Sequence, residues 1–249
     1  MGEGEGPVSL RFDAGVGAGP VSALLQRPRQ AELLYVLGHG AGAGMRHPFL
    51  QAVADRLGAV GVATFRYQFP YMEEGRRSPD PPHVAEATVR SAVLAAARAA
   101  PELPLVAGGK SFGGRMTSSA AAKSPLPGVR GLVFLGFPLH PPNRPADTRA
   151  AHLSEVQLPM LFLQGTRDDL ADLGLIKAVC QRLGARATLH VVEGADHSFH
   201  LPKRAARSVA EVVTELARTI VEWAKHELTA RTPEGTAAPA RAPCLRPRA

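Results

Sequence analysis

Residues 103–115 read LPLVAGGKSFGGR, and this stretch decides the fold. The apolar run 103–107 is typical of a buried strand, and the glycines after it indicate a sharp turn into a helix. Within the stretch, residues 109–113 match the pattern G-x-S-x-G, which places a serine on a strained strand-to-helix turn. We therefore expect the Ser111 hydroxyl to project above a sheet and the Lys110 side chain to point outward.

Apolar runs of strand length alternate with helical stretches along the rest of the chain. An antiparallel hairpin is expected at 8–12 and 21–26, further strands at 32–38, 61–67, 131–135, 160–164 and 187–192, and helices at 49–57, 83–100, 115–123, 170–183 and 208–226. This alternation predicts an α/β fold with a mostly parallel, doubly wound sheet and helices on both faces. The pattern fits one domain over residues 8–226, and its spacing leaves no room for a large cap domain.

The two ends of the chain differ from the domain in composition. Residues 1–7 are expected to form a flexible N-terminus, and they lack the apolar segment of a signal peptide. Residues 227–249 are rich in Ala, Pro and Arg and carry almost no core-forming side chains, so we expect a disordered tail.

The composition narrows the class of protein. Hydrophobic residues make up 45% and charged residues 20%, which excludes disorder of the whole chain. No apolar run approaches the ~18 residues that a membrane span needs. Two cysteines exclude a disulfide framework and favour a cytoplasmic setting. The net charge is +7, but the basic residues are scattered, so we expect neither a nucleic-acid nor a membrane partner; the oligomeric state stays open.

A serine nucleophile needs a base and an acid, which in this arrangement follow in the order Ser, Asp or Glu, His. Two later strands end in turns that carry such residues, Asp168 and His197. The carboxyl ends of parallel strands meet at one edge of a sheet, where open α/β sheets place their sites. Ser111, Asp168 and His197 are therefore the candidate catalytic residues. Asp169 and Asp172 remain alternatives for the acid, and Asp169 is also a candidate helix cap.

The glycine-rich loop 38–44 follows an early strand. In a serine hydrolase such a loop supplies one N–H of the oxyanion hole, here from Ala41 or Gly42, and the residue after the nucleophile, Phe112, supplies the other. A phosphate-binding loop is excluded because it needs a glycine where Pro104 stands. A dinucleotide-binding loop would need a helix that begins inside the motif and an acidic residue after the next strand, and the sequence has neither.

The loop that follows strand 61–67 is expected to line a substrate pocket, together with residues after two other strands. The candidate pocket residues are His39, Arg66, Tyr67, Phe69, Tyr71 and Phe137. Arg66, Arg76 and Arg77 could hold an anionic substrate group, or the loop arginines could pair with Glu73 and Glu74, and the sequence leaves both open.

Six segments carry a resemblance to a known family. They are HGAGAG at 39–44, FRYQFPYMEEGRR at 65–77, GGKSFGGRM at 108–116, FPLHPP at 137–142, GTRD at 165–168 and GADHS at 194–198. Over residues 8–226 the chain resembles α/β-hydrolases of the dienelactone-hydrolase-like branch. More closely, it resembles the testis-expressed protein 30 family, which includes the hydrolase-like domain of a non-specific-lethal chromatin complex subunit. The resemblance implies a triad of Ser111, Asp168 and His197 and supplies no substrate.

These observations favour a serine hydrolase that cleaves a small ester or thioester through an acyl-enzyme. No metal or cofactor is expected, because the sequence has no HExxH motif and no paired CxxC spacing. Two alternatives stay open. The fold could serve as a catalytically idle binding or adaptor protein, and the acyl group could pass to an acceptor other than water.

Overall fold

A computed structural model of the protein describes residues 6–15 and 17–230. Its core is one eight-stranded sheet in the order β1-β2-β4-β3-β5-β6-β7-β8. The strands are β1 (Val8–Asp13), β2 (Pro20–Gln26), β3 (Leu33–Gly38), β4 (Val62–Tyr67), β5 (Leu105–Lys110), β6 (Val129–Leu135), β7 (Met160–Arg167) and β8 (Ala187–Asp196). The β1–β2 hairpin pairs antiparallel with the edge of the sheet, and the other six strands run parallel. The predicted hairpin and mostly parallel sheet are confirmed.

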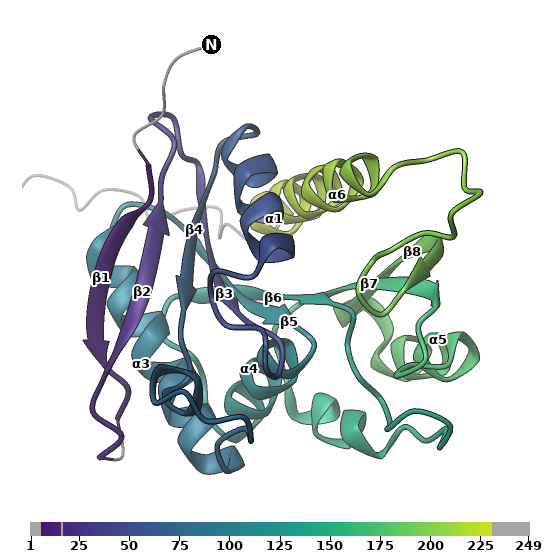
Figure 1. Ribbon diagram of the computed structural model, residues 1–249, viewed down its shortest axis with the longest axis horizontal. Coiled ribbons are helices and arrows are strands. Elements are labelled where there is room, and N and C mark those ends of the chain that lie inside the picture. The colour runs from purple at the N-terminus through teal and green to yellow at the C-terminus, as the bar shows by residue number, and fades with distance from the viewer. Residues whose placement is uncertain (1–5, 16, 231–249) are drawn as a thin grey trace, which may run out of the picture.

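Helices cover both faces of the sheet, as predicted (Figure 1). One face carries α1 (Pro48–Gly58) and α6 (Val209–Ala230), and the other carries α3 (Pro82–Ala99), α4 (Phe112–Lys123) and α5 (Leu173–Leu183). Each face has its own apolar cluster, which explains the continuous apolar run of β3. Leu34 and Val36 pack towards α3, whereas Tyr35 and Leu37 pack towards α1.

Three short helices were not predicted: α2 (Pro70–Glu73), η1 (Thr148–Glu155) and η2 (Gly184–Arg186). Pro70 stands at the start of α2, where its missing N–H costs nothing, so a loop that reads as proline-rich contains a helical turn. Helix α6 continues to Ala230, past the predicted end at position 226. The rest of the predicted tail, and residues 1–5 of the predicted N-terminus, lie outside the described residues.

The glycines at the end of β5 form strand rather than the predicted turn. Gly108 and Gly109 have φ values of 154° and 153°, which residues with side chains rarely adopt. A Cβ on Gly108 would lie 1.9 Å from the Val133 carbonyl oxygen, and one on Gly109 would lie 2.2 Å from that of Gly38. Two neighbouring strands therefore approach β5 more closely than any side chain permits.

No second domain covers the carboxyl edge of the sheet in the described part of the chain. Among the described residues, the connection from β6 to β7 contains only loop segments and η1. None of the helices in the described part of the chain is long and apolar enough to cross a membrane.

We expect Gly108→Ala to destabilise the fold by about 3 kcal/mol or more, because the methyl group has no space and the backbone cannot relax without moving β6. The thermal midpoint should fall by roughly 6–12 °C in a domain of this size. Gly58→Ala is the matched control, because its Cβ would meet only the Gln26 amide at 3.8 Å. Equal midpoints for the two variants, measured by calorimetry, would contradict the close approach.

Candidate active site

Ser111 occupies a strained turn between β5 and α4. Its φ of 49° is unusual for a residue with a side chain. Its N–H donates to the Leu135 carbonyl at 3.2 Å, and α4 begins at the next residue. Gly113 permits the turn, because a Cβ there would lie 2.4 Å from the Gly38 carbonyl carbon. The turn places the serine hydroxyl at the carboxyl edge of the sheet, beside the partial positive charge of the α4 N-terminus.

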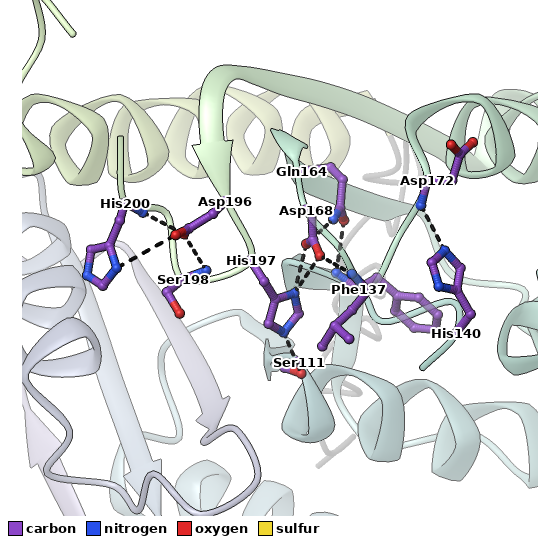
Figure 2. Close-up of polar contacts among 11 residues, drawn as sticks. Ser111, Phe137, His140, Gln164, Asp168, Asp172, Asp196, His197, Ser198 and His200 are labelled. Carbon is purple, nitrogen blue, oxygen red and sulfur yellow. Dashed lines mark hydrogen bonds and ion pairs between the residues drawn. The ribbon is translucent and has the colours of Figure 1, made fainter. Parts of the chain in front are cut away.

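A chain of hydrogen bonds joins Ser111, His197 and Asp168 (Figure 2). The Ser111 Oγ lies 2.9 Å from His197 Nε2, and His197 Nδ1 lies 2.9 and 2.8 Å from the two oxygens of Asp168. The Asp168 side chain is fully buried and that of His197 is 17% exposed. A carboxylate at Nδ1 selects the tautomer with a proton on Nδ1, which leaves Nε2 free to accept the serine proton. The structure thus brings together the three residues that the sequence singled out.

Gln164 holds Asp168 in place, and sequence reasoning missed it. The Gln164 Nε2 donates to Asp168 Oδ2 at 2.5 Å, and its Oε1 accepts the Phe137 N–H at 3.0 Å. The Leu170 N–H donates to Asp168 Oδ1 at 2.8 Å. The sequence did carry a signal for this residue. Gln164 ends the apolar run MLFLQ, and an amide buried at the end of such a strand needs hydrogen-bond partners.

The two alternative acids lie elsewhere. Asp169 is exposed. Asp172, not Asp169, caps α5, with its carboxylate accepting the Leu175 N–H at 2.9 Å. The Asp172 N–H in turn donates to His140 Nε2 at 3.0 Å, which gives that buried histidine a structural contact (Figure 2).

The turn that carries His197 is fastened by its neighbours. Asp196 Oδ1 accepts the N–H groups of Ser198 and His200 at 2.8 and 2.9 Å. Phe199 has a φ of 62° and stacks on Phe49 of α1 at a centroid distance of 5.5 Å. Asp196 therefore shapes the loop, and no hydrogen bond joins it to the His197 imidazole.

Neither the N–H of Phe112, the first residue of α4, nor that of Ala41 donates a hydrogen bond to an acceptor in the described part of the chain. The Gly42 N–H donates to Tyr71 Oη at 2.9 Å, so it is already engaged. Of the two candidates in this loop, the geometry therefore favours Ala41 as the donor that a developing oxyanion could use.

A family described as an alpha/beta hydrolase domain matches residues 31–225. The chain belongs to this alpha/beta hydrolase family. Among solved structures it is similar to a dienelactone hydrolase from Anabaena variabilis, at 23% identity and a TM-score of 0.68, covering 88% of this chain and 98% of that one.

Two further solved structures are similar to this alpha/beta hydrolase. One is a serine hydrolase without a lid from Xanthomonas campestris, at 20% identity and a TM-score of 0.68, covering 88% of this chain and 95% of that one. The other is a serine hydrolase homologue from Coxiella burnetii, at 18% identity and a TM-score of 0.69, covering 88% and 99%. At these identities the likeness is one of fold.

Arg66 and Tyr67 do not line a pocket in this hydrolase, which corrects the sequence prediction. Both are 0% exposed, because β4 extends through Tyr67 and directs successive side chains to opposite faces of the sheet. The Arg66 guanidinium donates to Gln51 Oε1 at 2.9 Å and to Gln26 Oε1 at 3.3 Å. The Tyr67 ring packs on the rings of Phe12 and Phe69.

Phe69, Tyr71 and Phe137 are also buried, so their side chains pack beneath the site and present no surface to a substrate. Phe69 and Tyr71 pack against the Phe112 ring, with centroids 5.1 and 6.3 Å away. Phe137 lies among the rings of Phe134 and Phe162.

Arg76 pairs with acidic residues of its own loop, whereas Glu73 pairs with Arg11 of β1 at 3.3 Å. Arg76 forms ion pairs with Glu74 at 2.5 Å and with Asp80 at 2.6 Å. Of the two alternatives for this arginine, substrate binding or ion pairing, the structure therefore favours ion pairing. Arg77 is exposed. Lys110 does not point outward as predicted: it is only 9% exposed.

His39 is held as a neutral group. Its Nδ1 lies 2.8 Å from the Gly40 carbonyl and its Nε2 accepts the Phe69 N–H at 3.1 Å, which assigns the proton to Nδ1. Burial lowers its pKa to about 4, against a weaker opposing effect of the Gly40 carbonyl. His39 therefore joins two loops beneath the site and is not a pocket residue.

We expect the His39 ring to show no titration between pH 5.5 and 7 in NMR spectra and to keep the Nδ1–H tautomer. Its folded pKa lies below that of the unfolded chain, so the unfolded state binds more protons between about pH 6.5 and 4. The stability that neutral His39 contributes is thus lost as the pH falls through that window. An inflection near pH 6.5 in the folded protein would contradict the assignment.

Proposed function

We propose that this alpha/beta hydrolase is a serine hydrolase that cleaves a small ester or thioester through an acyl-enzyme. The observation that carries the proposal is the hydrogen-bonded chain from Ser111 through His197 to Asp168. The three groups match a nucleophile, a general base and an orienting carboxylate in identity, order and contact.

In the acylation step Ser111 Oγ attacks the carbonyl carbon of the ester while His197 Nε2 takes its proton. The buried Asp168 carboxylate stabilises the imidazolium that forms. The carbonyl oxygen becomes an oxyanion, held by the N–H groups of Phe112 and Ala41. Collapse of this intermediate breaks the bond to the leaving group, which receives the proton from His197.

In the deacylation step water replaces the leaving group. His197 takes a proton from the water, whose oxygen attacks the acyl carbon. The second tetrahedral intermediate collapses, Ser111 recovers its proton from His197, and the acid product leaves. The ester and one water molecule, together with the chain's own residues, balance both steps.

Access to the nucleophile supports this substrate class. Ser111 and Phe112 are partly exposed and Ala41 is exposed, so a small ester or thioester can reach the serine hydroxyl from solvent. The serine hydrolase from Xanthomonas campestris is also described as having no lid. The resemblance to the testis-expressed protein 30 family remains part of this proposal and adds no substrate.

We expect Ser111→Ala to fold normally and to lower kcat/KM for a short-chain aryl ester by about 10⁴ or more, because no other group supplies the nucleophile. Ser154→Ala, at an exposed position of η1, is the control and should match the wild type. Residual activity within tenfold of wild type would place the nucleophile at another residue.

We expect Asp168→Asn to reduce turnover far more than Asp169→Asn, by roughly 10²–10⁴ against less than about twofold. An amide at 168 would accept the Nδ1 proton less well and would not stabilise an imidazolium, whereas Asp169 is exposed and does not touch His197. The comparison is made in steady-state ester hydrolysis. The opposite ranking would mean that Asp168 is not the orienting acid.

A further inference from the structure

Lys110 is the residue before Ser111, and its side chain is buried with nothing to bind. It is 9% exposed, and its Nζ has no hydrogen-bond partner among the described residues. The stem packs against Gly40, and the Nζ lies 5.7 Å from the centroid of the Phe199 ring. A buried lysine without a partner costs stability, so its presence beside the nucleophile calls for a functional reason.

Gly136 marks where the ammonium lies. A Cβ built on Gly136 would be 3.1 Å from Lys110 Nζ, 3.4 Å from the His197 carbonyl oxygen and 3.5 Å from Asp168 Oδ2. The ammonium and the carboxylate thus border the same small space beside Gly136. The lysine thus lies at the acid end of the hydrogen-bonded chain.

The titratable groups around the ammonium come from the ends of two strands. Asp168 faces it from the β7–α5 turn, and Asp196 and His197 lie at the end of β8. Burial lowers the pKa of Lys110 to about 8, while Asp168 and Asp196 act to raise it. Lys110 therefore carries its charge at neutral pH.

We propose that Lys110 is a positioning residue of the active site, whose buried ammonium acts through Asp168 to keep the carboxylate charged and His197 neutral and ready to accept a proton. The inference rests on the proposed serine hydrolase function. A positive charge stabilises the neighbouring carboxylate and opposes a second positive charge on the imidazole. The negative charge of Asp168 attracts a positive charge onto the His197 imidazole, and the positive charge of Lys110 counteracts that attraction.

The test is the rate at which a fluorophosphonate labels Ser111, measured from pH 5 to 9.5, because it needs no knowledge of the substrate. Labelling requires neutral His197, so the acid limb of the profile follows the imidazole. Removing the ammonium with Lys110→Met should move that limb to higher pH by about one unit. Lys110→Arg keeps the charge and should keep the wild-type limb.

Lys177→Met, at an exposed position of α5, is the control for loss of a lysine and should leave the profile unchanged. The inference is overturned if the acid limb of Lys110→Met stays within 0.2 pH units of the wild-type limb, which is roughly the precision of such a profile. It is also overturned if only the plateau rate of labelling falls, because that is the result of a purely structural role. An equal shift in Lys110→Arg overturns it as well. Failure of the wild type to be labelled at Ser111 would instead refute the proposed hydrolase function.

A second measurement uses the wild-type protein, so it does not depend on whether a Lys110 variant folds. The chain has five lysines, Lys110, Lys123, Lys177, Lys203 and Lys225, so protein with ¹³C-labelled lysine gives few signals. One Nζ should lose its proton near pH 8 and shift when a fluorophosphonate is bound. The inference is overturned if every lysine signal titrates in the same way in the free protein and in the fluorophosphonate adduct. It is also overturned if one lysine is already neutral at pH 6.

Discussion

Where β5 turns into α4, the backbones of three strands and a helix come closer than side chains allow. A Cβ on Gly108, Gly109 or Gly113 would collide with the backbone of β6 or β3. This contact forces the chain to turn at Ser111 with a left-handed φ, and the surrounding strands hold the strain. The direction of the serine hydroxyl and the start of α4 at Phe112 both follow from it.

The rest of the site is built from buried polar groups that satisfy one another. Gln164 ties Asp168 to the backbone of the β6 loop, and Asp196 ties down the turn that carries His197. His39 joins the loop after β3 to the loop after β4. Each bond lies at the carboxyl edge of the sheet, where successive parallel strands end side by side. The geometry of the candidate site therefore depends on strand order more than on any single loop.

The fold and the Ser111, Asp168 and His197 cluster were predictable because strand ends and short motifs determine them. Periodicity located the strands, and parallel order brings their carboxyl ends together. The pocket prediction failed although the end of strand 61–67 was predicted correctly: Arg66 and Tyr67 belong to that strand, and its side chains alternate between the two covered faces of the sheet. Gly42 could not be separated from Ala41, because the Tyr71 hydroxyl that engages it lies far away in sequence.

The orientation of Lys110 was also hidden from sequence reasoning. A lysine in the variable position of a G-x-S-x-G motif reads as solvated, and only the burial of the end of β5 beneath the His197 turn shows otherwise. Polar residues inside apolar runs, such as Gln164, were the available signal for the supporting contacts.

The most direct measurement is a crystal structure of the adduct that the protein forms with a fluorophosphonate ester. The account predicts a bond from phosphorus to Ser111 Oγ and a phosphoryl oxygen about 2.7–3.1 Å from the N–H groups of both Phe112 and Ala41, with His197 still bonded to Asp168. An adduct on another residue, or a phosphoryl oxygen that points away from these two N–H groups, would contradict it.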